Sequence, residues 1–146
     1  MARVQIEMPE TYAFTTRIQV RLGDIVGGLH LANHILISYL NEAMCLFFRD
    51  NGFATLDIEG YSVINADLAI IYKSESMHGD TLKIDVAIDE LRRHGCNFYY
   101  RVNNERTGLD TANAKMAMLF FDYTKRKLGA VPDSFRAAFE KYCLPS

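Results

Sequence analysis

The sequence predicts an α+β fold in which a curved antiparallel β-sheet wraps around a long central α-helix, with a second helix near the C-terminus. The first observation is that residues 33–50 carry apolar side chains on most sides of a helix, so other elements must cover that helix. The second is that four segments after residue 60 alternate between apolar and polar residues, as half-buried strands do. A single curved sheet of such strands can enclose the helix.

The composition is that of one folded domain covering residues 1–146. A chain of 146 residues is long enough to bury a single hydrophobic core. Its hydrophobic content of 49% and aromatic content of 12% are typical of a globular protein and not of a disordered chain.

The first half of the chain contains one strand and the long helix. The alternation over residues 13–22 predicts a half-buried strand, and the glycine-rich residues 23–29 follow it as a loop. The helix is predicted to span residues 33–50 and to be buried nearly all round. Asn33 is suited to cap its N-terminus, and Gly52 is suited to cap its C-terminus.

The second half contains four strands, joined by short turns and followed by a helix. The helix, over residues 132–143, has a proline just inside its start and aromatic residues on one face. A linker over residues 53–60 precedes the strands. The predicted strands are residues 61–73, 82–91, 96–102 and 111–123, with turns at 77–80 and 104–108.

Charge and cysteine content exclude several classes of protein. The net charge of −2 and the pI near 6.1 argue against nucleic acid as a partner, since phosphate binding needs a basic surface. The sequence has no apolar run of the length of a membrane span and no signal peptide, so no membrane association is expected. Three cysteines without CxxC spacing indicate reduced thiols in a cytoplasmic protein and argue against a structural zinc.

The segment over residues 23–43, GDIVGGLHLANHILISYLNEA, concentrates residues that can do chemistry. An acid at the end of the first strand, Asp24, is followed by Gly27 and Gly28 and then by His30. The long helix begins directly afterwards and carries one further acid, Glu42. An acid, flexible glycines, a histidine and a helix N-terminus are suited to polarise a carbonyl group.

This order of elements resembles the hotdog-fold thioesterases, in particular the branch of acyl-CoA and 4-hydroxybenzoyl-CoA thioesterases. The resemblance covers nearly the whole chain. The family motif that ends the first strand corresponds to VRLGD, and its Gly-His-Val-Asn-Asn-like segment corresponds to LHLAN at residues 29–33. The helix motif corresponds to residues 36–43, and the family's Gly-Asp before a long strand corresponds to Gly79 and Asp80.

The sequence departs from the family pattern at three positions. Val26 stands where family members often place a catalytic acid, two residues after the first Asp. Gly28 stands where related plant acyl-carrier-protein thioesterases place an Asn, and Ala32 replaces the first Asn of the Asn-Asn pair.

The resemblance implies an enzyme that hydrolyses an acyl-CoA or acyl-carrier-protein thioester without a metal ion or a cofactor. In the family, backbone N–H groups at the start of the central helix polarise the thioester carbonyl. The family also pairs its subunits and builds its sites between them, so a homodimer or homotetramer is expected.

Four residues are candidates for catalysis. By resemblance to helix-borne glutamates in other hotdog branches, Glu42 is the first choice for general base or nucleophile, and burial among apolar neighbours should raise its pKa. The alternatives are an ion pair with Arg17 or Arg21, or a place at the subunit interface. His30 could orient water, bind the carbonyl or protonate the leaving sulfur, or it could hold the loop through Asp24 or loop carbonyls.

Asp24 is either an acid catalyst or, more in keeping with its place at a strand end, an acceptor for loop or helix amides. Asn33 is expected at the helix start, where capping alone would explain it.

A second set of residues is expected to contact the substrate. Gly27 and Gly28 would let the substrate approach the backbone closely, or they simply make a tight turn. Leu29 and His34 flank the same site, with the subunit interface as the alternative place for His34. Glu75, at the end of a predicted strand, is expected to face solvent or a partner subunit.

Two rival functions remain open. A non-catalytic module that binds acyl thioesters is suggested by Val26, which replaces the usual acid. An enoyl-CoA hydratase on the same fold would use an Asp and a His, for which the spacing of Asp24 and His30 is similar, although the Asn-Pro pair usual between them is absent.

Overall fold

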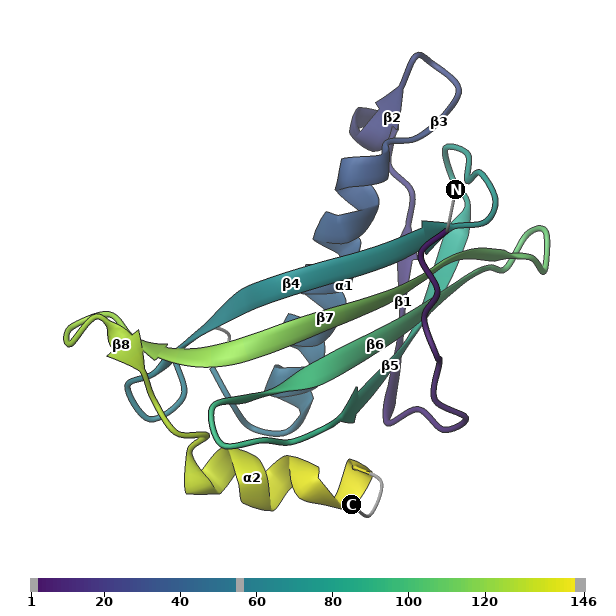
Figure 1. Ribbon diagram of the computed structural model, residues 1–146. Helices are drawn as coiled ribbons and strands as arrows, with labels where there is room; N and C mark the ends of the chain where they lie inside the picture. The colour runs from purple at the N-terminus through teal and green to yellow at the C-terminus, as the bar shows by residue number, and fades with distance from the viewer. Residues whose placement is uncertain (1–2, 55–56, 144–146) are drawn as a thin grey trace.

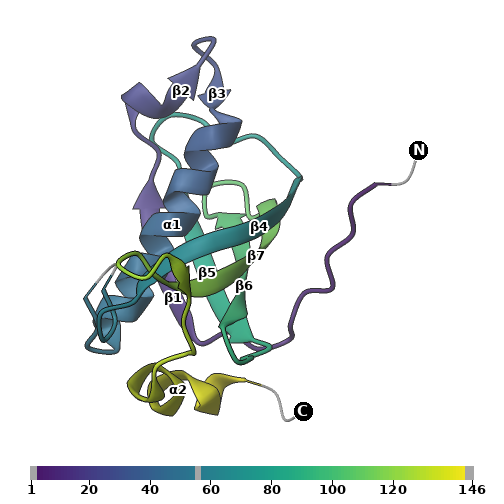
Figure 2. The same ribbon diagram turned by 60° about the vertical axis from the view of Figure 1, so that its left-hand side comes forward.

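One long helix, α1 (Asn33–Asp50), lies against a curved antiparallel sheet that curls around it (Figure 1). The computed structural model describes residues 3–54 and 57–143. A second helix, α2 (Asp133–Phe139), lies across one end of the sheet, as the turned view in Figure 2 shows. The arrangement confirms the predicted α+β fold with a central and a C-terminal helix.

The main sheet is built from β1 (Phe14–Gln19), β4 (Ser62–Tyr72), β5 (Thr81–Asp89), β6 (Gly95–Asn104), β7 (Asp110–Asp122) and β8 (Lys127–Leu128). Its strands follow the order β1-β5-β6-β7-β4, and all the pairings are antiparallel. The strand β1 and the strand β4, which follows α1, therefore form the two edges, and β8 pairs with the end of β7.

Each predicted long strand has a counterpart in the structure, with ends displaced by a few residues. The predicted loop at residues 23–29 is more ordered than expected. It contains the end of a short 3-10 helix, η1 (Leu22–Asp24), and part of a hairpin of β2 (Ile25–Val26) and β3 (His30–Leu31). Strands of two residues carry no readable alternation, so the sequence pattern did not indicate them. Another 3-10 turn, η2 (Glu140–Tyr142), extends α2. In the predicted linker over residues 53–60, residues 55–56 lie outside the described part.

The helix α1 has the predicted bounds but is buried on one face only. Its buried residues, such as Leu36, Leu40 and Phe47, recur three or four positions apart and pack into the core. Ser38 and Glu42 on the opposite face are exposed. The expectation of burial nearly all round is therefore wrong for the protomer, because the sheet covers only one side of the helix. Within residues 3–54 and 57–143, no helix is both long enough and apolar enough to cross a membrane.

The C-terminus of α1 is closed by backbone hydrogen bonds. Asn51 is the C-cap residue, one position before the predicted Gly52. Gly52 has a φ of 87° and donates its N–H to the carbonyl of Arg49 at 3.0 Å. A residue in this left-handed conformation is usually glycine, since a Cβ atom is disfavoured there.

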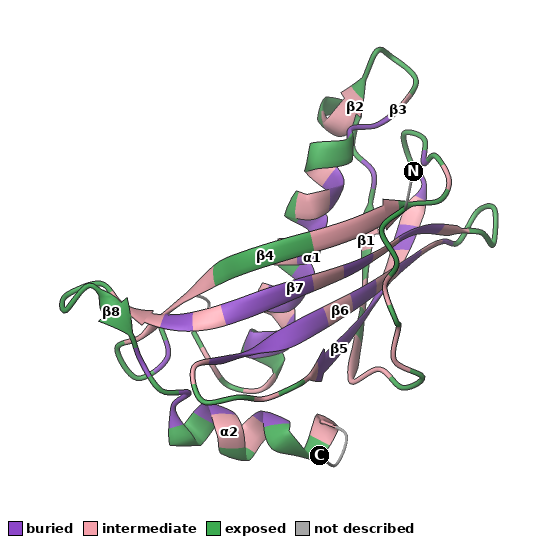
Figure 3. Cartoon of the chain, viewed as in Figure 1, coloured by how far each residue is buried: buried purple, intermediate pink, exposed green. Residues whose placement is uncertain are grey.

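Aromatic rings from both helices form the core at the end of the sheet that α2 covers. The ring of Phe48 in α1 lies 5.6 Å from that of Phe135 and 5.8 Å from that of Phe139, both in α2. Phe47 also contacts Phe139, at 5.1 Å between ring centroids. Figure 3 shows buried residues on the sides of α2 and α1 that face the sheet. The second helix is therefore part of the core.

The Gly79-Asp80 motif forms a buried ionic anchor at the start of β5. The carboxylate of Asp80 is 4% exposed and accepts hydrogen bonds from the Met77 amide at 2.8 Å, the Asn104 side chain at 2.8 Å and the Arg106 guanidinium at 2.5 Å. The hydrogen bond from Arg106 is the main reason that the pKa of Asp80 lies well below its usual value, although burial acts in the opposite direction. The anchor joins the turn before β5 to the turn between β6 and β7.

We expect Asp80→Asn to lower the free energy of unfolding at pH 7 by about 2 kcal/mol, because the buried side chain of Asn104, the Met77 amide and the Arg106 guanidinium lose their ionised acceptor. A lowered pKa stabilises the fold above the pKa of the unfolded carboxyl, about 3.9, and this contribution is lost as the pH falls further. The difference in Tm between the two proteins should therefore be largest at neutral pH and shrink below about pH 4. Thermal unfolding followed by circular dichroism would measure it.

The control is Asp50→Asn, at an exposed position at the end of α1, which should change Tm little at either pH. A difference between wild type and Asp80→Asn that is the same at pH 3 and pH 7 would contradict the ionic role of Asp80.

Candidate functional site

The hairpin of β2 and β3 leads the chain directly into α1. Gly27 and Gly28 form its turn, with φ angles of 61° and 70°, and the N–H of Leu29 returns to the carbonyl of Val26 at 3.3 Å. Two successive positive φ angles are typical of a type I′ hairpin turn, which favours glycine at both positions. The positive φ angles of the turn therefore explain why both positions are glycine. The turn places His30 in β3, immediately before the helix.

The N-terminus of α1 has no side-chain cap. Ala32 is the N-cap residue and Asn33 is the first helical residue, so the prediction that Asn33 caps the helix is wrong. The carbonyl of Asn33 instead accepts a hydrogen bond from the hydroxyl of Tyr72, at 3.0 Å. The first amides of a helix have no acceptor within it, so the N–H groups of Asn33 and His34 carry the positive end of the helix dipole without a capping oxygen.

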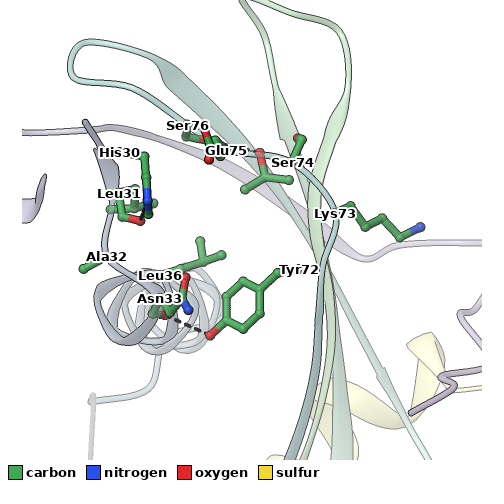
Figure 4. Close-up of a pocket in the computed structure, with 11 residues that line it drawn as sticks. His30, Leu31, Ala32, Asn33, Leu36, Tyr72, Lys73, Ser74, Glu75 and Ser76 are labelled. Atoms are coloured by element: carbon green, nitrogen blue, oxygen red, sulfur yellow. Dashed lines mark hydrogen bonds between the residues drawn. The ribbon is translucent and has the colours of Figure 1, made fainter. Parts of the chain in front are cut away.

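This uncapped helix start opens into a cavity of about 290 Å³, shown in Figure 4. One wall comes from β3 and α1, and the other comes from the end of β4 and the segment after it. Leu31, Ala32 and Leu36 give part of the lining an apolar character, and each of them is buried. The full lining is His30, Leu31, Ala32, Asn33, Leu36, residues 72–76 and Thr111.

A buried pair of hydroxyl groups connects the segment after β4 to β7, and a backbone hydrogen bond connects that segment to β3. The Oγ atom of Ser76 lies 3.1 Å from Oγ1 of Thr111 in β7, and both residues are buried. The carbonyl of Ser76 accepts the N–H of Leu31 at 2.8 Å, which ties the segment after β4 to β3. The cavity therefore has fixed walls. The imidazole of His30, the carboxylate of Glu75 and the uncapped start of α1 at Asn33 lie around it.

Of the four catalytic candidates, His30 and Asn33 line this cavity, while Asp24 and Glu42 do not. The latter two line a second groove, between β1 and the outer face of α1. The structure thus divides the candidates between two sides of the helix. His30 is half-buried, with its Nδ1 atom 3.1 Å from the carbonyl of Leu31, and its Nε2 atom has no hydrogen bond within the described ranges.

Asp24 is engaged by Tyr39 and not by His30. The hydroxyl of Tyr39 donates to Oδ2 of Asp24 at 2.5 Å, and the carbonyl of Asp24 accepts the N–H of Ala32 at 3.0 Å. Burial, followed by the hydrogen bond to Asp24, raises the pKa of Tyr39 to about 12, so the phenol keeps its proton at neutral pH. Asp24 thus links η1 to the start of α1, with its carboxylate bound to a tyrosine hydroxyl and its backbone carbonyl, not its side chain, bound to a helix-start amide.

Glu42 is exposed in the protomer, so the expectation that apolar neighbours bury it is wrong. It shares its groove with Arg17 and Arg21, the partners considered for it. Arg17, however, pairs with Glu105, with 2.7 Å between Nε and Oε1. In the part of the chain that the structure describes, Glu42 forms no ion pair.

The four residues predicted to contact substrate, Gly27, Gly28, Leu29 and His34, are exposed and do not line the cavity. Their role in binding stays a prediction. No group of three or more His, Cys, Asp or Glu side chains suited to a metal ion occurs in residues 3–54 and 57–143.

Nothing in the sequence pattern indicated that several of the cavity residues belong to the site. Tyr72, Ser76 and Thr111 read as ordinary strand or turn residues, and Glu75 was expected to face solvent or a partner. Their meeting with His30 depends on the long-range contact between Leu31 and Ser76, which periodicity does not reveal.

The family model described as "Thioesterase-like superfamily" matches residues 20–139 of the chain. This span runs from the end of the first strand through α2 and contains all the cavity residues. No curated protein matches the sequence.

Solved structures share the fold at low sequence identity. A 1,4-dihydroxy-2-naphthoyl-CoA thioesterase from Synechocystis superposes with a TM-score of 0.77 at 18% identity, over 86% of this chain and 93% of that chain. A Staphylococcus aureus protein solved in complex with CoA gives 0.78 at 17% identity, over 97% and 92%. A gentisyl-coenzyme A thioesterase gives 0.76 at 17% identity, over 86% and 99%.

Proposed function

The chain belongs to the thioesterase-like superfamily, and we therefore propose that it hydrolyses an acyl thioester of CoA, or of acyl carrier protein, to a free acid and a thiol. The observation that carries this proposal is the uncapped N-terminus of α1, which opens into a cavity with His30 on its wall. A thioester carbonyl needs hydrogen-bond donors where negative charge develops, and helix amides without a cap supply them.

In the proposed reaction, the carbonyl oxygen takes up a hydrogen bond from the N–H group of Asn33, the first residue of α1 and part of the cavity lining. This amide, at the positive end of the helix dipole, strengthens its hold as the oxygen becomes negative in the tetrahedral intermediate. The acyl group lies against the apolar lining formed by Leu31 and Leu36. His30 hydrogen-bonds the substrate or protonates the departing sulfur.

The other predicted site residues take roles that follow from their positions. Asp24 is a positioning residue, since it fixes the start of α1 through Tyr39 and Ala32. Glu42 lines the second groove, so within one protomer it could act as base on an acyl group that enters that groove. The exposed turn at Gly27 and Gly28, with Leu29 and His34 beside it, would contact the part of the thioester that extends out of the cavity.

We also propose that the protein is a homodimer, or a homotetramer built from dimers, paired through the edge strand β4. In the described residues, β4 pairs with β7 along one side only, and its residues 65–68 are exposed. A long strand with an open edge readily pairs with another copy. The cavity is lined by the end of β4, so pairing there would complete one side of the site. Static light scattering that finds only monomers would count against this.

Thiol release from a panel of short, long and aromatic acyl-CoAs tests the proposed activity. The wild type should turn over at least one of them, and His30→Ala should lower kcat/KM by about a hundredfold, as expected when a group that transfers or holds a proton is removed. Crotonyl-CoA belongs in the panel because loss of its enoyl absorbance without thiol release would indicate hydration instead.

The matched control is His78→Ala, an exposed histidine in the turn before β5 that does not line the cavity. This variant should keep the wild-type rate. Wild-type protein that releases no thiol from any member of the panel would rule out the proposed hydrolysis.

Binding without hydrolysis is the second candidate, and one observation favours it. Val26, which replaces the common acid, pairs with His30 across the hairpin and offers no carboxylate there. Calorimetric binding of an acyl-CoA that stays intact would support a binding module.

A further inference from the structure

The proposed hydrolysis needs a base that activates water, and the hairpin does not provide one. Val26 is apolar, and the carboxylates of Asp24 and Glu42 lie in the second groove. Glu75 is the one carboxylate that lines the cavity at the helix N-terminus, among the residues that the structure describes. This brings a carboxylate, the imidazole of His30 and the helix amides to the same cavity.

The backbone on both sides of Glu75 is held in place. On one side, the amide of Ser74 donates to the carbonyl of Thr111 at 3.3 Å, and its hydroxyl donates to the carbonyl of Asp110 at 2.7 Å. On the other side, Ser76 contacts Thr111 through its hydroxyl and Leu31 through its carbonyl. Glu75 therefore projects from a fixed segment, as a base that must aim at one position should.

The carboxylate of Glu75 is itself unengaged. It is exposed, and it forms no hydrogen bond or ion pair with any residue in 3–54 or 57–143. Asp24, Asp67, Asp80 and Asp85 each hold a protein donor. A carboxylate with open lone pairs beside a cavity can accept a proton from water.

The contact between Leu31 and Ser76 brings the two reactive side chains together. Glu75 and His30 each precede one of these hydrogen-bonded residues, and Figure 4 shows both on neighbouring segments at one end of the cavity. A water molecule between them would face a carbonyl held at the start of α1.

We propose that Glu75 is the general base of the hydrolysis, an inference that rests on the proposed function. Its carboxylate takes a proton from water as the water oxygen bonds to the carbonyl carbon, and the carbonyl π electrons move to the oxygen at the helix amides. When the carbonyl re-forms, the C–S bond breaks and the sulfur leaves with the bonding pair. The proton on Glu75 then passes to the thiolate, which yields acid and thiol and regenerates the carboxylate.

The test compares Glu75→Gln with Glu140→Gln, which makes the same change at an exposed position in η2. Glu75→Gln should lower kcat by about a hundredfold or more, the usual contribution of a general base, with KM and Tm nearly unchanged. Glu140→Gln should match the wild type. In Glu75→Ala, added formate should restore part of kcat, because a small carboxylate can occupy the space left by the side chain.

The outcomes separate this inference from the proposed function. If the wild type hydrolyses an acyl-CoA and Glu75→Gln keeps the wild-type rate, Glu75 is not the general base, but the proposed hydrolase activity is retained. If Glu42→Gln abolishes turnover and Glu75→Gln does not, the base lies in the second groove, and the proposed role of Glu75 is again wrong. If the wild type is inactive on the whole panel, both the proposed hydrolase activity and the proposed base are wrong.

Discussion

Gly95→Ala should lower the free energy of unfolding by about 3 kcal/mol, because the new methyl group has no room. A Cβ atom at this position would lie 1.8 Å from the carbonyl oxygen of Met118 and 2.9 Å from its carbonyl carbon. Both are backbone atoms of β7, the strand that pairs with β6, so relief requires that the two strands move apart. Denaturation in urea would measure the loss as a lower midpoint.

The matched control is Gly23→Ala, since a Cβ atom there would meet no heavy atom within 4 Å. Gly23 also lacks a positive φ angle, so alanine should be tolerated with little change in the midpoint. Equal effects at the two positions would show that the strand contact at Gly95 is not the cause of the destabilisation.

Phe135→Ala should cost about 4 kcal/mol, a value typical of deleting a buried aromatic ring from a well-packed core. The side chain is fully buried, and its ring lies 4.9 Å from that of Phe120, 4.4 Å from that of Phe139 and 5.6 Å from that of Phe48. Its removal leaves a cavity between α2 and the sheet that the surrounding rings can fill only in part. Guanidinium denaturation monitored by circular dichroism would report the loss.

Phe121→Ala removes the same ring from a half-buried position in β7 and should cost clearly less. Both phenylalanines lie outside the proposed active cavity. Well below its Tm, Phe135→Ala should therefore keep the wild-type rate on any acyl-CoA that the protein hydrolyses. A large stability loss in Phe121→Ala and a small one in Phe135→Ala would contradict α2 as a core element.

The fold could be predicted from the sequence because its long elements have local patterns. The bounds of α1 and the existence of β4, β5, β6 and β7 follow from periodicity, which depends on neighbouring residues alone. The two-residue strands β2, β3 and β8 escaped prediction because a pattern of period two needs more residues to be visible.

Burial around α1 was harder to predict than the helix itself. An apolar residue such as Ile37 or Leu46 fits a buried helix, yet both remain partly exposed because the sheet covers one face. The same error placed Glu42 in an apolar environment, whereas it lies on the open side. The number of apolar residues in a helix does not show which of its faces another element or another subunit covers.

The candidate site was predictable only where it is continuous in sequence. His30 and Asn33 were found because they adjoin the start of α1. Glu75 and Thr111 reach the cavity through sheet pairing and through the hydrogen bond between Leu31 and Ser76, which join distant parts of the chain. The incorrect prediction that Asn33 caps α1 has another cause. The actual N-cap residue, Ala32, has no polar side chain that would mark a helix boundary in the sequence.

The place of α1 in the chain has a consequence for how the protein is made. The ribosome produces this helix before β4, β5, β6, β7 and α2, which supply most of its covering surface. During elongation Phe14 of β1 can already stack on Phe47, but the rest of this aromatic face, including Phe48, stays uncovered until the later strands arrive and Phe135 and Phe139 close over it. Long-range pairing of this kind forms slowly, and exposed apolar surface on unfinished chains promotes aggregation. The nascent chain is therefore most in need of a chaperone between the completion of α1 and the docking of α2.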